Sequence, residues 1–407
     1  MAVDLLLKFG TIIVEGREYQ RAVGIKTGKI EGIYKIGQEP EADTVISCKN
    51  RIILPGAIDI HVHMRDLNQS NKEDYHSGTK AAAAGGITTV VDMPNSSPPT
   101  LDWDSLESKI RKAREGRYVN VGFYAGIPND ISEFDGDMAK NLLGLKVYPH
   151  SPLNKEVVYD DTRIKDCLRF ASSLGLPLLV HPDDTKPGTT VDSVEEFFDL
   201  HSCESEVNSV TKFIDALHSL DEEAHLHICH VSCAAAARLI TKNRAEERLT
   251  AEVTPHHLLL TGADFSNEDG IAKMLPPLRS LYDNEALREL LSRCGVDIVA
   301  SDHAPHTSEE KLTSFLQAQA GVPGLETTVP LMLTEVLEGR LSWVEYLRVC
   351  CSGPARILGL VGKGVLSEGY DADLVIVAKE EWTIMGSEFH SKAKITPFEG
   401  RKVLAKP

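Results

Sequence analysis

Two histidines separated by a single residue, His61 and His63, are the first side chains in this sequence that could do chemistry. They follow an apolar run at residues 52–58 that predicts a buried strand. Residues two apart in a strand point to the same face, so both imidazoles should project together. Two imidazoles can supply half of a tetrahedral zinc site. The alternative is a pair of histidines that are hydrogen-bonded within a core.

Arg65 comes two residues after His63 and continues the same alternation. Its guanidinium group is a planar fork of donors that matches a carboxylate. The stretch therefore predicts two metal ligands and, beside them, an anchor for an anionic group.

The elements that must position these side chains form an alternating series. Strand-like apolar runs occur at residues 57–63, 88–93, 119–125, 142–148, 177–181, 224–231, 249–253 and 296–301. Helix-like segments lie between most of them, at residues 72–84, 102–115, 161–173, 204–219, 234–244 and 284–294. Alternation of this kind predicts an α/β fold with a parallel sheet. Eight strands favour a closed (β/α)8 TIM-like barrel over an open doubly wound sheet.

The two ends of the chain follow a different pattern. Short strand-like runs lie at residues 5–14, 21–26, 29–36 and 44–47, and again at 364–366, 373–377 and 401–404. The N-terminal piece is too short to bury a good core alone. We therefore predict a small β-sandwich domain composed of residues 1–52 and 364–407, beside a barrel of residues 53–363. The long segment 303–324 predicts a functional loop after the last barrel strand.

In such a barrel, catalytic side chains lie at the carboxyl ends of the strands. The polar residues at these ends are His61, His63, Asn95, Lys146, His181, His230 and Asp302. Four histidines and an aspartate can hold two metal ions. Lys146 could bridge the two ions if its amine, deprotonated by burial, reacted with carbon dioxide to give a carbamate. The alternatives for Lys146 are a substrate-binding cation and a strand lysine that extends toward water.

The composition limits the class of protein. The chain has 407 residues, of which 42% are hydrophobic and 25% charged, as in ordinary soluble proteins. A formal net charge of −17 argues against nucleic acid or an anionic membrane as a partner. The eight cysteines show no spacing typical of a disulfide framework. Because we find no apolar run of membrane-spanning length and no signal peptide pattern, we expect a cytoplasmic protein.

The set of strand-end residues resembles that of the amidohydrolase superfamily, within it the cyclic amidases, and most closely the dihydroorotase family. Residues 85–95 (GGITTVVDMPN) are similar to that family's second-strand motif, and residues 301–307 (SDHAPHT) to its signature at strand 8. Residues 321–327 (GVPGLET) resemble the loop that follows. Residues 252–258 and 369–374 also fit, so the resemblance runs nearly from end to end.

The resemblance implies a binuclear zinc centre. His61, His63 and Asp302 would bind one zinc ion, and His181 and His230 would bind the second. Carboxylated Lys146 and a hydroxide would bridge the two ions, and Asp302 would be the catalytic acid and base. The residues expected to contact the substrate are His63, Arg65, Asn95, His306, Ala320 and Gly321.

The implied reaction is the reversible cyclisation of N-carbamoyl-L-aspartate to (S)-dihydroorotate and water, in de novo pyrimidine synthesis. Other cyclic amidases, namely dihydropyrimidinase or hydantoinase and allantoinase, are alternatives. Their substrates need carry no carboxylate, so Arg65 argues against them, more weakly for allantoinase. A catalytically inactive scaffold protein is a further alternative, but all six metal-ligand positions are filled. We also expect a homo-oligomer, such as a dimer, that could associate with aspartate carbamoyltransferase.

Three departures from the family pattern stand out. Arg65 is followed by Asp-Leu-Asn where Glu-Pro-Gly is common, and Leu275 replaces a common substrate-contacting asparagine. The strand 5 histidine is followed by Pro-Asp-Asp instead of the commoner Ala-Glu. We assign His256 and His257 to structural hydrogen bonding, and we expect Cys229 to be buried on the face of its strand opposite His230.

Overall fold

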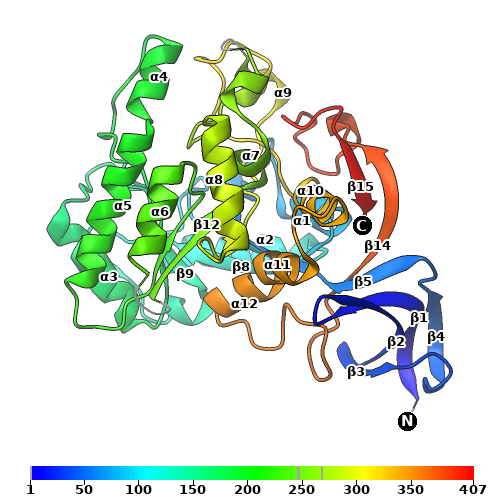
Figure 1. The fold of residues 1–407 in the computed structure, drawn as a ribbon. Helices are drawn as coiled ribbons and strands as arrows, with labels where there is room; N and C mark the ends of the chain where they lie inside the picture. Colours follow the sequence, from blue (N-terminus) through cyan, green and yellow to red (C-terminus); the bar gives the residue numbers. More distant parts are fainter. Residues whose placement is uncertain (1, 245–247, 267–268) are drawn as a thin grey trace.

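The computed structural model describes residues 2–244, 248–266 and 269–407. They form a barrel of strands surrounded by helices, and beside it a sheet built from both ends of the chain (Figure 1). Strands and helices alternate along the barrel part of the chain, in agreement with the predicted α/β class. Among the described residues, no helix combines the length and the apolar composition needed to cross a bilayer.

The barrel is an eight-stranded sheet in which sequential strands are parallel neighbours. Its strands are β6 (Ala57–Val62), β7 (Ile87–Asp92), β8 (Asn120–Ala125), β9 (Gly144–Val147), β10 (Leu178–Val180), β11 (Leu226–Ile228), β12 (Leu249–Val253) and β13 (Ile298–Val299). The ring closes just beyond β13, where Val62 and His303 form a parallel bridge. His63 N there donates to His303 O at 2.8 Å. Each of the eight predicted runs overlaps one strand, which confirms the TIM-like barrel.

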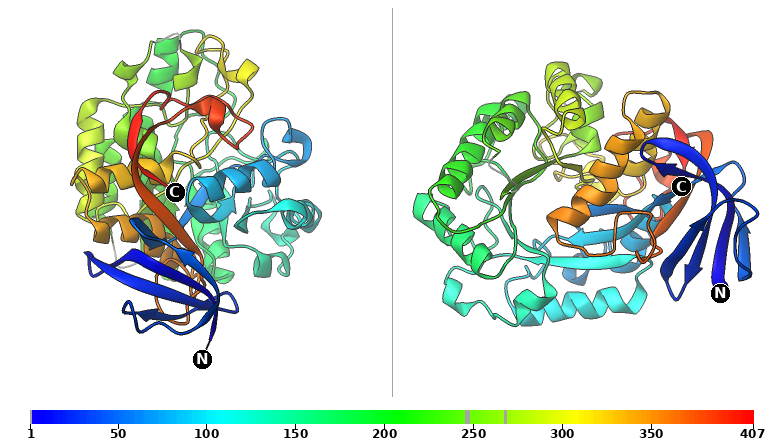
Figure 2. Two further views of the ribbon diagram at one scale, coloured as in Figure 1. Left: turned by 90° about the vertical axis from the view of Figure 1, so that its right-hand side faces the viewer. Right: turned by 60° about the horizontal axis from the view of Figure 1, so that its bottom comes forward.

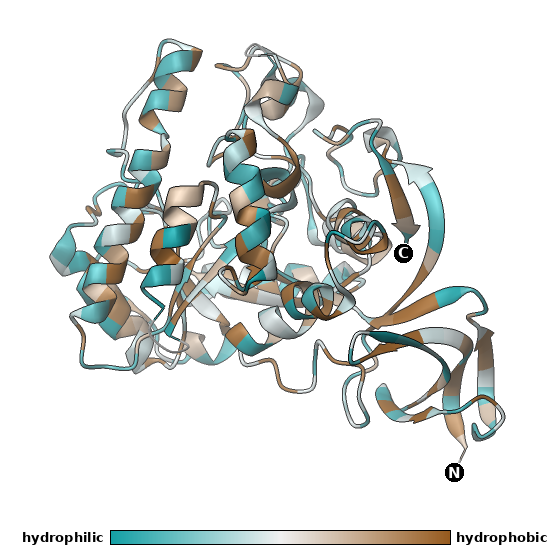
Figure 3. Ribbon diagram, in the orientation of Figure 1, coloured by the Kyte–Doolittle hydropathy of each residue, from teal (hydrophilic) through white to brown (hydrophobic). Residues whose placement is uncertain are grey.

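Helices surround the strands, as the right-hand view of Figure 2 shows. They are α1 (Tyr75–Ala84), α2 (Trp103–Gly116), α3 (Asp161–Ser173), α4 (Val194–Leu200), α5 (Cys203–His218), α6 (Ala234–Lys242), α7 (Pro255–Leu259), α8 (Leu281–Ser292), α9 (Ser308–Lys311), α10 (Thr328–Leu337), α11 (Trp343–Leu347) and α12 (Gly353–Ile357). Along α5 and α8, hydrophilic and hydrophobic residues alternate (Figure 3). On α5, Val210, Phe213 and Leu217 are buried at helical spacing against the barrel. Capping boxes at Asp74 and Asp102 begin α1 and α2.

Apolar side chains fill part of the barrel interior. Ile58, Ile60, Val91 and Leu179 pack there with Ile357 of α12, in a cluster separate from the one beneath the outer helices. The interior is thus solid on the side of α12. Polar residues of the strands are left to gather at the opposite, carboxyl-terminal end.

The sheet from the chain ends has seven strands, in the order β15-β14-β5-β1-β2-β3, with β4 paired to β1. Its strands are β1 (Val3–Val14), β2 (Arg17–Lys26), β3 (Lys29–Tyr34), β4 (Ala42–Ser47), β5 (Arg51–Pro55), β14 (Leu374–Thr383) and β15 (Lys402–Lys406). It is mixed, because β1 pairs antiparallel with β2 and parallel with β4 and β5. Both chain ends therefore build one sheet, as predicted. The division at residues 52/53 and 363/364 stays a prediction.

Two local predictions differ from the structure. The apolar run 52–58 is not one strand: β5 belongs to the end sheet and β6 to the barrel, and Gly56 separates them. A Cβ at Gly56 would lie 2.2 Å from the Thr88 side chain, so the chain passes here without one. The strand predicted at residues 364–366 is absent from the described chain, because Gly364 takes a left-handed turn with φ of 76°.

Candidate metal centre

A cavity of about 540 Å³ opens at the carboxyl ends of the barrel strands. The predicted residues that line it are His61, His63, Arg65, Asn95, His181, His230, Asp302, His306, Ala320 and Gly321. Lys146, also predicted, is fully buried, and its Nζ lies 5.1 Å from the centre of the Tyr148 ring, which lines the same cavity. The structure thus brings the whole predicted set together at one end of the barrel.

A β-bulge aims the two histidines of β6 into the barrel. The pairing of β6 with β7 shifts by one residue between Asp59 and Val62. Ile60 packs in the barrel interior, whereas Val62 packs beneath the helices. An extra residue lets neighbouring side chains share a face, so His61 follows Ile60 inward and His63 resumes the alternation. The two imidazole ring centres are 5.5 Å apart.

Asp302 is the point on which these histidines converge. Its Oδ1 lies 3.3 Å from His61 Nε2 and 3.2 Å from His63 Nε2. Ligand atoms of His61, His230 and Asp302 all lie within 4.8 Å of one another. Burial raises the pKa of Asp302, but His61 and His63 outweigh it and hold this pKa well below its usual range. An ionised carboxylate between imidazoles is a donor set that zinc accepts.

The remaining ring nitrogens of the β6 histidines face protein acceptors. His63 Nδ1 donates to Asn95 Oδ1 at 2.6 Å, and His61 Nδ1 donates to Glu252 Oε1. Glu252, near the end of β12, is fully buried and was not predicted. Its place in residues 252–258, which fit the family, was the only sequence signal. Contacts of this kind fix which nitrogen of a histidine is free to bind a metal ion.

His181 and His230 follow β10 and β11 and lie face to edge, with ring centres 4.4 Å apart. Burial, followed by neighbouring histidines, holds both pKa values well below 6.5, so both rings are neutral. His181 Nε2 and His230 Nδ1 are buried without a hydrogen-bond partner among the described residues. Buried polar atoms are seldom left unpaired. These orphaned nitrogens therefore fit a metal ion.

Cys229 is buried, as predicted, but the predicted face of its strand is wrong. Cys229 packs in the barrel interior, where its Sγ lies 2.8 Å from Lys146 Nζ and close to His61 and Glu252. Strand alternation points Cys229 inward, and it would point His230 outward. His230 reaches the cavity instead because its backbone turns left-handed, with φ of 33°.

The other side of the cavity carries positive charge. Arg65 Nε donates to Pro305 O at 3.3 Å, and Arg65 Nη2 lies 3.2 Å from His306 Nε2. His306 Nε2 in turn donates to Ala320 O at 3.0 Å. Within the described part of the chain, Arg65 forms no ion pair with a carboxylate. Lys72, which was not predicted, also lines this wall.

Other residues divide into structural and unassigned groups. His257 bonds Thr254 Oγ1 at 2.8 Å and Pro276 O at 3.0 Å, which confirms a structural role for it. The His256 ring lies against His257 at a tilt of 57°, with ring centres 4.5 Å apart. Leu275 lines the cavity and offers only an apolar surface there. His150, without a predicted role, stacks on His181 at 4.1 Å between ring centres.

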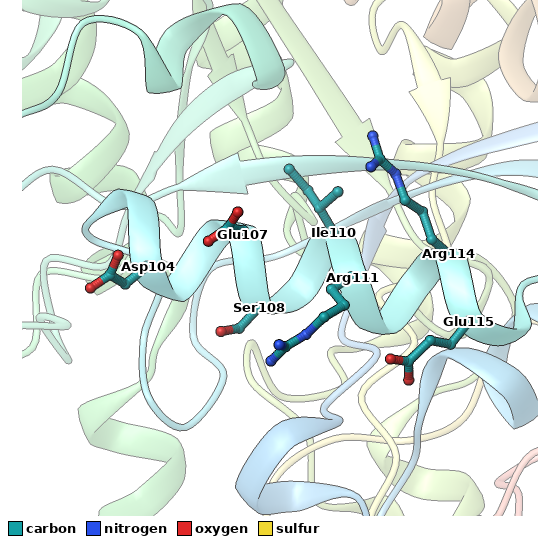
Figure 4. A pocket seen from close by; sticks show the side chains of 7 residues that line it. All are labelled: Asp104, Glu107, Ser108, Ile110, Arg111, Arg114 and Glu115. Atoms are coloured by element: carbon teal, nitrogen blue, oxygen red, sulfur yellow. The ribbon is translucent and has the colours of Figure 1, made fainter.

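A second hollow, of about 630 Å³, follows the outer surface of α2 (Figure 4). Its labelled side chains, among them Glu107, Arg111 and Arg114, all come from that one helix. Charged side chains of both signs along one helix are typical of a solvated face. The metal-ligand candidates line the smaller cavity in the barrel, so the chemistry is placed there.

Comparison with known proteins identifies the family of this chain. Residues 52–403 match the amidohydrolase family. A dihydroorotase from Methanosarcina acetivorans is 35% identical, with 92% of this chain and 84% of the relative covered. A dihydroorotase from Pyrococcus abyssi is 36% identical, with 98% and 92% covered.

Solved structures show the same fold. The L-hydantoinase (dihydropyrimidinase) from Arthrobacter aurescens has a TM-score of 0.91 and 26% identity, covering 100% of this chain and 94% of its own. The dihydropyrimidinase from Brevibacillus agri has a TM-score of 0.85 at 24% identity, covering 98% and 92%. With the family match and the dihydroorotase relatives, these findings lead to one conclusion: the chain belongs to the amidohydrolase family.

Proposed function

We propose that this protein is a dihydroorotase, a hydrolase of cyclic amides that interconverts N-carbamoyl-L-aspartate and (S)-dihydroorotate plus water. The observation that carries the proposal is Arg65, a guanidinium group in the cavity wall that forms no ion pair with a carboxylate in the described chain and feels Asp302 only at longer range. Dihydroorotate carries a carboxylate on its ring, and the relatives named above are dihydroorotases. Hydantoin and dihydrouracil would leave Arg65 unpaired.

We propose two zinc ions per chain as the cofactor. His61, His63 and Asp302 would hold the first ion, and His181 and His230 the second, with Lys146 as a carbamate between them. Zinc in such a centre lowers the pKa of water and polarises a carbonyl oxygen. The orphaned nitrogens of His181 and His230, and the complete burial of the Lys146 amine, support this assignment.

Asp302 is proposed to move the proton. Its depressed pKa keeps the carboxylate ionised at neutral pH, so it can accept a proton from the attacking water. In the hydrolytic direction it would then pass this proton to the amide nitrogen as the ring opens. In the reverse direction the same carboxylate would take the proton from the nitrogen that attacks.

The remaining lining residues are proposed to orient the ring. Arg65 would form a forked contact with the substrate carboxylate. Asn95 already accepts a hydrogen bond from His63 through Oδ1, which leaves its amide N–H groups free to donate to the same carboxylate. His306 and the backbone at Ala320 and Gly321 would contact the other end of the ring. Fixing the ring in this way places its amide carbon beside Asp302.

The test is a comparison of substrates on purified, zinc-loaded protein. We expect kcat/KM for dihydroorotate to exceed that for dihydrouracil, hydantoin and allantoin by about a hundredfold or more, as one buried charged contact allows. The second candidate is a hydantoinase, since the solved neighbours with this fold include hydantoinases. A preference for hydantoin or dihydrouracil would select that alternative.

We further propose a cytoplasmic homodimer that can associate with aspartate carbamoyltransferase. The high negative charge is consistent with a protein that stays in solution. Light scattering after size-exclusion chromatography, with and without that enzyme, measures both associations. A monomer that elutes unchanged in the mixture would contradict both.

A further inference from the structure

A chain of hydrogen bonds inside the barrel ends at His61. The proposed reaction gives no role to the other residues of this chain. Thr250 Oγ1 lies 2.9 Å from His227 Nδ1, and His227 Nε2 lies 3.1 Å from Glu252 Oε2. Glu252 Oε1 accepts from His61 Nδ1. Thr250 is 3% exposed, and both His227 and Glu252 are 0% exposed. Water therefore does not compete for the hydrogen bonds between these residues.

Thr250, His227 and Glu252 come from the neighbouring strands β11 and β12, and strand alternation points them to the same side of the sheet. Thr250 and Glu252 are two residues apart on β12 and share a face. His227 pairs directly with Thr250 on the neighbouring strand β11. His225, two residues earlier in the chain, also reaches Thr250, with Nε2 at 2.8 Å from Oγ1.

The carboxylate at the centre dictates where the protons lie. An ionised carboxylate only accepts hydrogen bonds, so His61 Nδ1 and His227 Nε2 must each carry a hydrogen. A neutral His227 then has a lone pair on Nδ1, which accepts from the Thr250 hydroxyl. Since that hydroxyl has one hydrogen, His225 Nε2 must donate to Thr250. Each neutral ring is left with one tautomer.

We propose that Thr250 and His227 are positioning residues of the metal centre, which act through Glu252 to fix the tautomer and orientation of His61. His61 Nε2 is then the nitrogen left to bind a metal ion, on the side where Asp302 Oδ1 lies 3.3 Å away. This inference rests on the proposed role of His61 as a zinc ligand. It adds a chain of three residues, Glu252, His227 and Thr250, that holds this ligand in place from behind the cavity.

The decisive variant is Thr250→Val, which removes the hydroxyl and keeps the shape of the side chain. The matched control is Thr89→Val on β7: Thr89 is equally buried, and its hydroxyl has no partner among the described residues. Groups that support a metal ligand typically contribute 10- to 100-fold to metal affinity. Because Thr250 acts through two residues, we expect zinc affinity to fall about tenfold in Thr250→Val and to be unchanged in Thr89→Val.

Zinc affinity is measured by competition with a chromogenic chelator, and tautomers by nitrogen NMR of protein labelled at histidine, in the metal-free state. In the expected spectrum of the unaltered protein, His61 carries a hydrogen on Nδ1, and His227 carries one on Nε2 alone. The His227 signal should be altered in Thr250→Val. Equal zinc affinity in the two valine variants, or a doubly protonated His227 in the unaltered protein, would overturn the proposal.

Glu252→Gln tests the same chain at its centre. The amide can accept from only one of the two histidines, so His61 or His227 must change tautomer, and zinc affinity should fall about a hundredfold. Unfolding midpoints of all variants control for loss of fold. The spectrum of the metal-free protein does not depend on turnover, so an enzyme inactive on dihydroorotate would refute the proposed function and leave this inference to be decided by its own data.

Discussion

The two candidate halves of the metal centre are held in different ways. On the β6 side, both nitrogens of His61 and of His63 face a partner, supplied by Glu252, Asn95 and Asp302. On the β10–β11 side, one ring nitrogen of each histidine, His181 Nε2 and His230 Nδ1, has no partner among the described residues. The protein alone organises the first half. We expect the second half to need groups that the polypeptide itself does not supply.

The pKa values of the histidines also differ between the two halves. Burial lowers the pKa of His61, but Glu252 and Asp302 outweigh it and raise the value to about 10. No such carboxylate dominates beside His181 or His230, and burial holds both pKa values well below 6.5. The first half therefore attracts positive charge before any metal ion binds. In the second half, His181 and His230 offer neutral lone pairs, and the Asp183 carboxylate beside His181 is already hydrogen-bonded to His201 at 2.6 Å. We therefore expect this half to depend on the carbamate at Lys146 for charge.

The strongest test of this contrast is Lys146→Ala. Without a bridging carbamate, we expect one zinc ion per chain in place of two. We expect activity to fall by well over the roughly 100-fold typical for loss of a group that only supports a ligand. Elemental analysis and dihydroorotate turnover measure both quantities, and a short carboxylic acid with added zinc should restore part of the activity. Two zinc ions retained at full occupancy would contradict the bridge.

The substitution Arg65→Met tests whether a residue next to β6 binds the substrate carboxylate. A charged contact in a buried site contributes roughly 2–5 kcal/mol when one partner is removed, which is about 30-fold to several thousand-fold. We expect kcat/KM for dihydroorotate to fall by such a factor while the zinc content stays constant. Dihydrouracil, which lacks the carboxylate, is the control substrate and should change much less. An equal loss for both substrates would make Arg65 a structural residue.

Stepwise removal of metal compares the halves directly. Because the β6 side is organised in advance, we expect its zinc ion to bind about tenfold more tightly than the one at His181 and His230. Dialysis against increasing chelator, with zinc measured at each step, should give a plateau near one ion per chain. Loss of both ions in a single step would show that the halves are not independent.

His150→Phe should have the smallest effect. The substitution keeps a ring stacked on His181 and removes the His150 nitrogens, one of which is unpartnered among the described residues. If His150 only packs, zinc content should be unchanged and activity should change by less than about threefold. Loss of the second zinc ion in this variant would instead make His150 a ligand of the β10–β11 half.

The sequence predicted the barrel and the residues at its rim because apolar strand runs end in polar side chains at recognisable places. It failed where side-chain direction departs from simple alternation. Cys229 and His230 both point into the barrel, against the alternation expected of neighbours on a strand, because His230 is left-handed. The bulge in β6 could not be anticipated either. The role of Glu252 was missed because it depends on hydrogen bonds to His61 and His227. These two residues lie on other strands and are distant from Glu252 in the sequence.

The passage from β5 to β6 through Gly56 bears on how the protein can be shortened. β5 is hydrogen-bonded between β1 and β14, and the next strand of the chain carries His61 and leads directly to His63. Trimming the first forty or so residues would remove β1 and leave an edge of β5 with unpaired backbone groups, which invites aggregation. Tags added at either terminus leave this pairing intact. Shortened proteins that begin at the barrel lose this pairing, and we expect them to be insoluble.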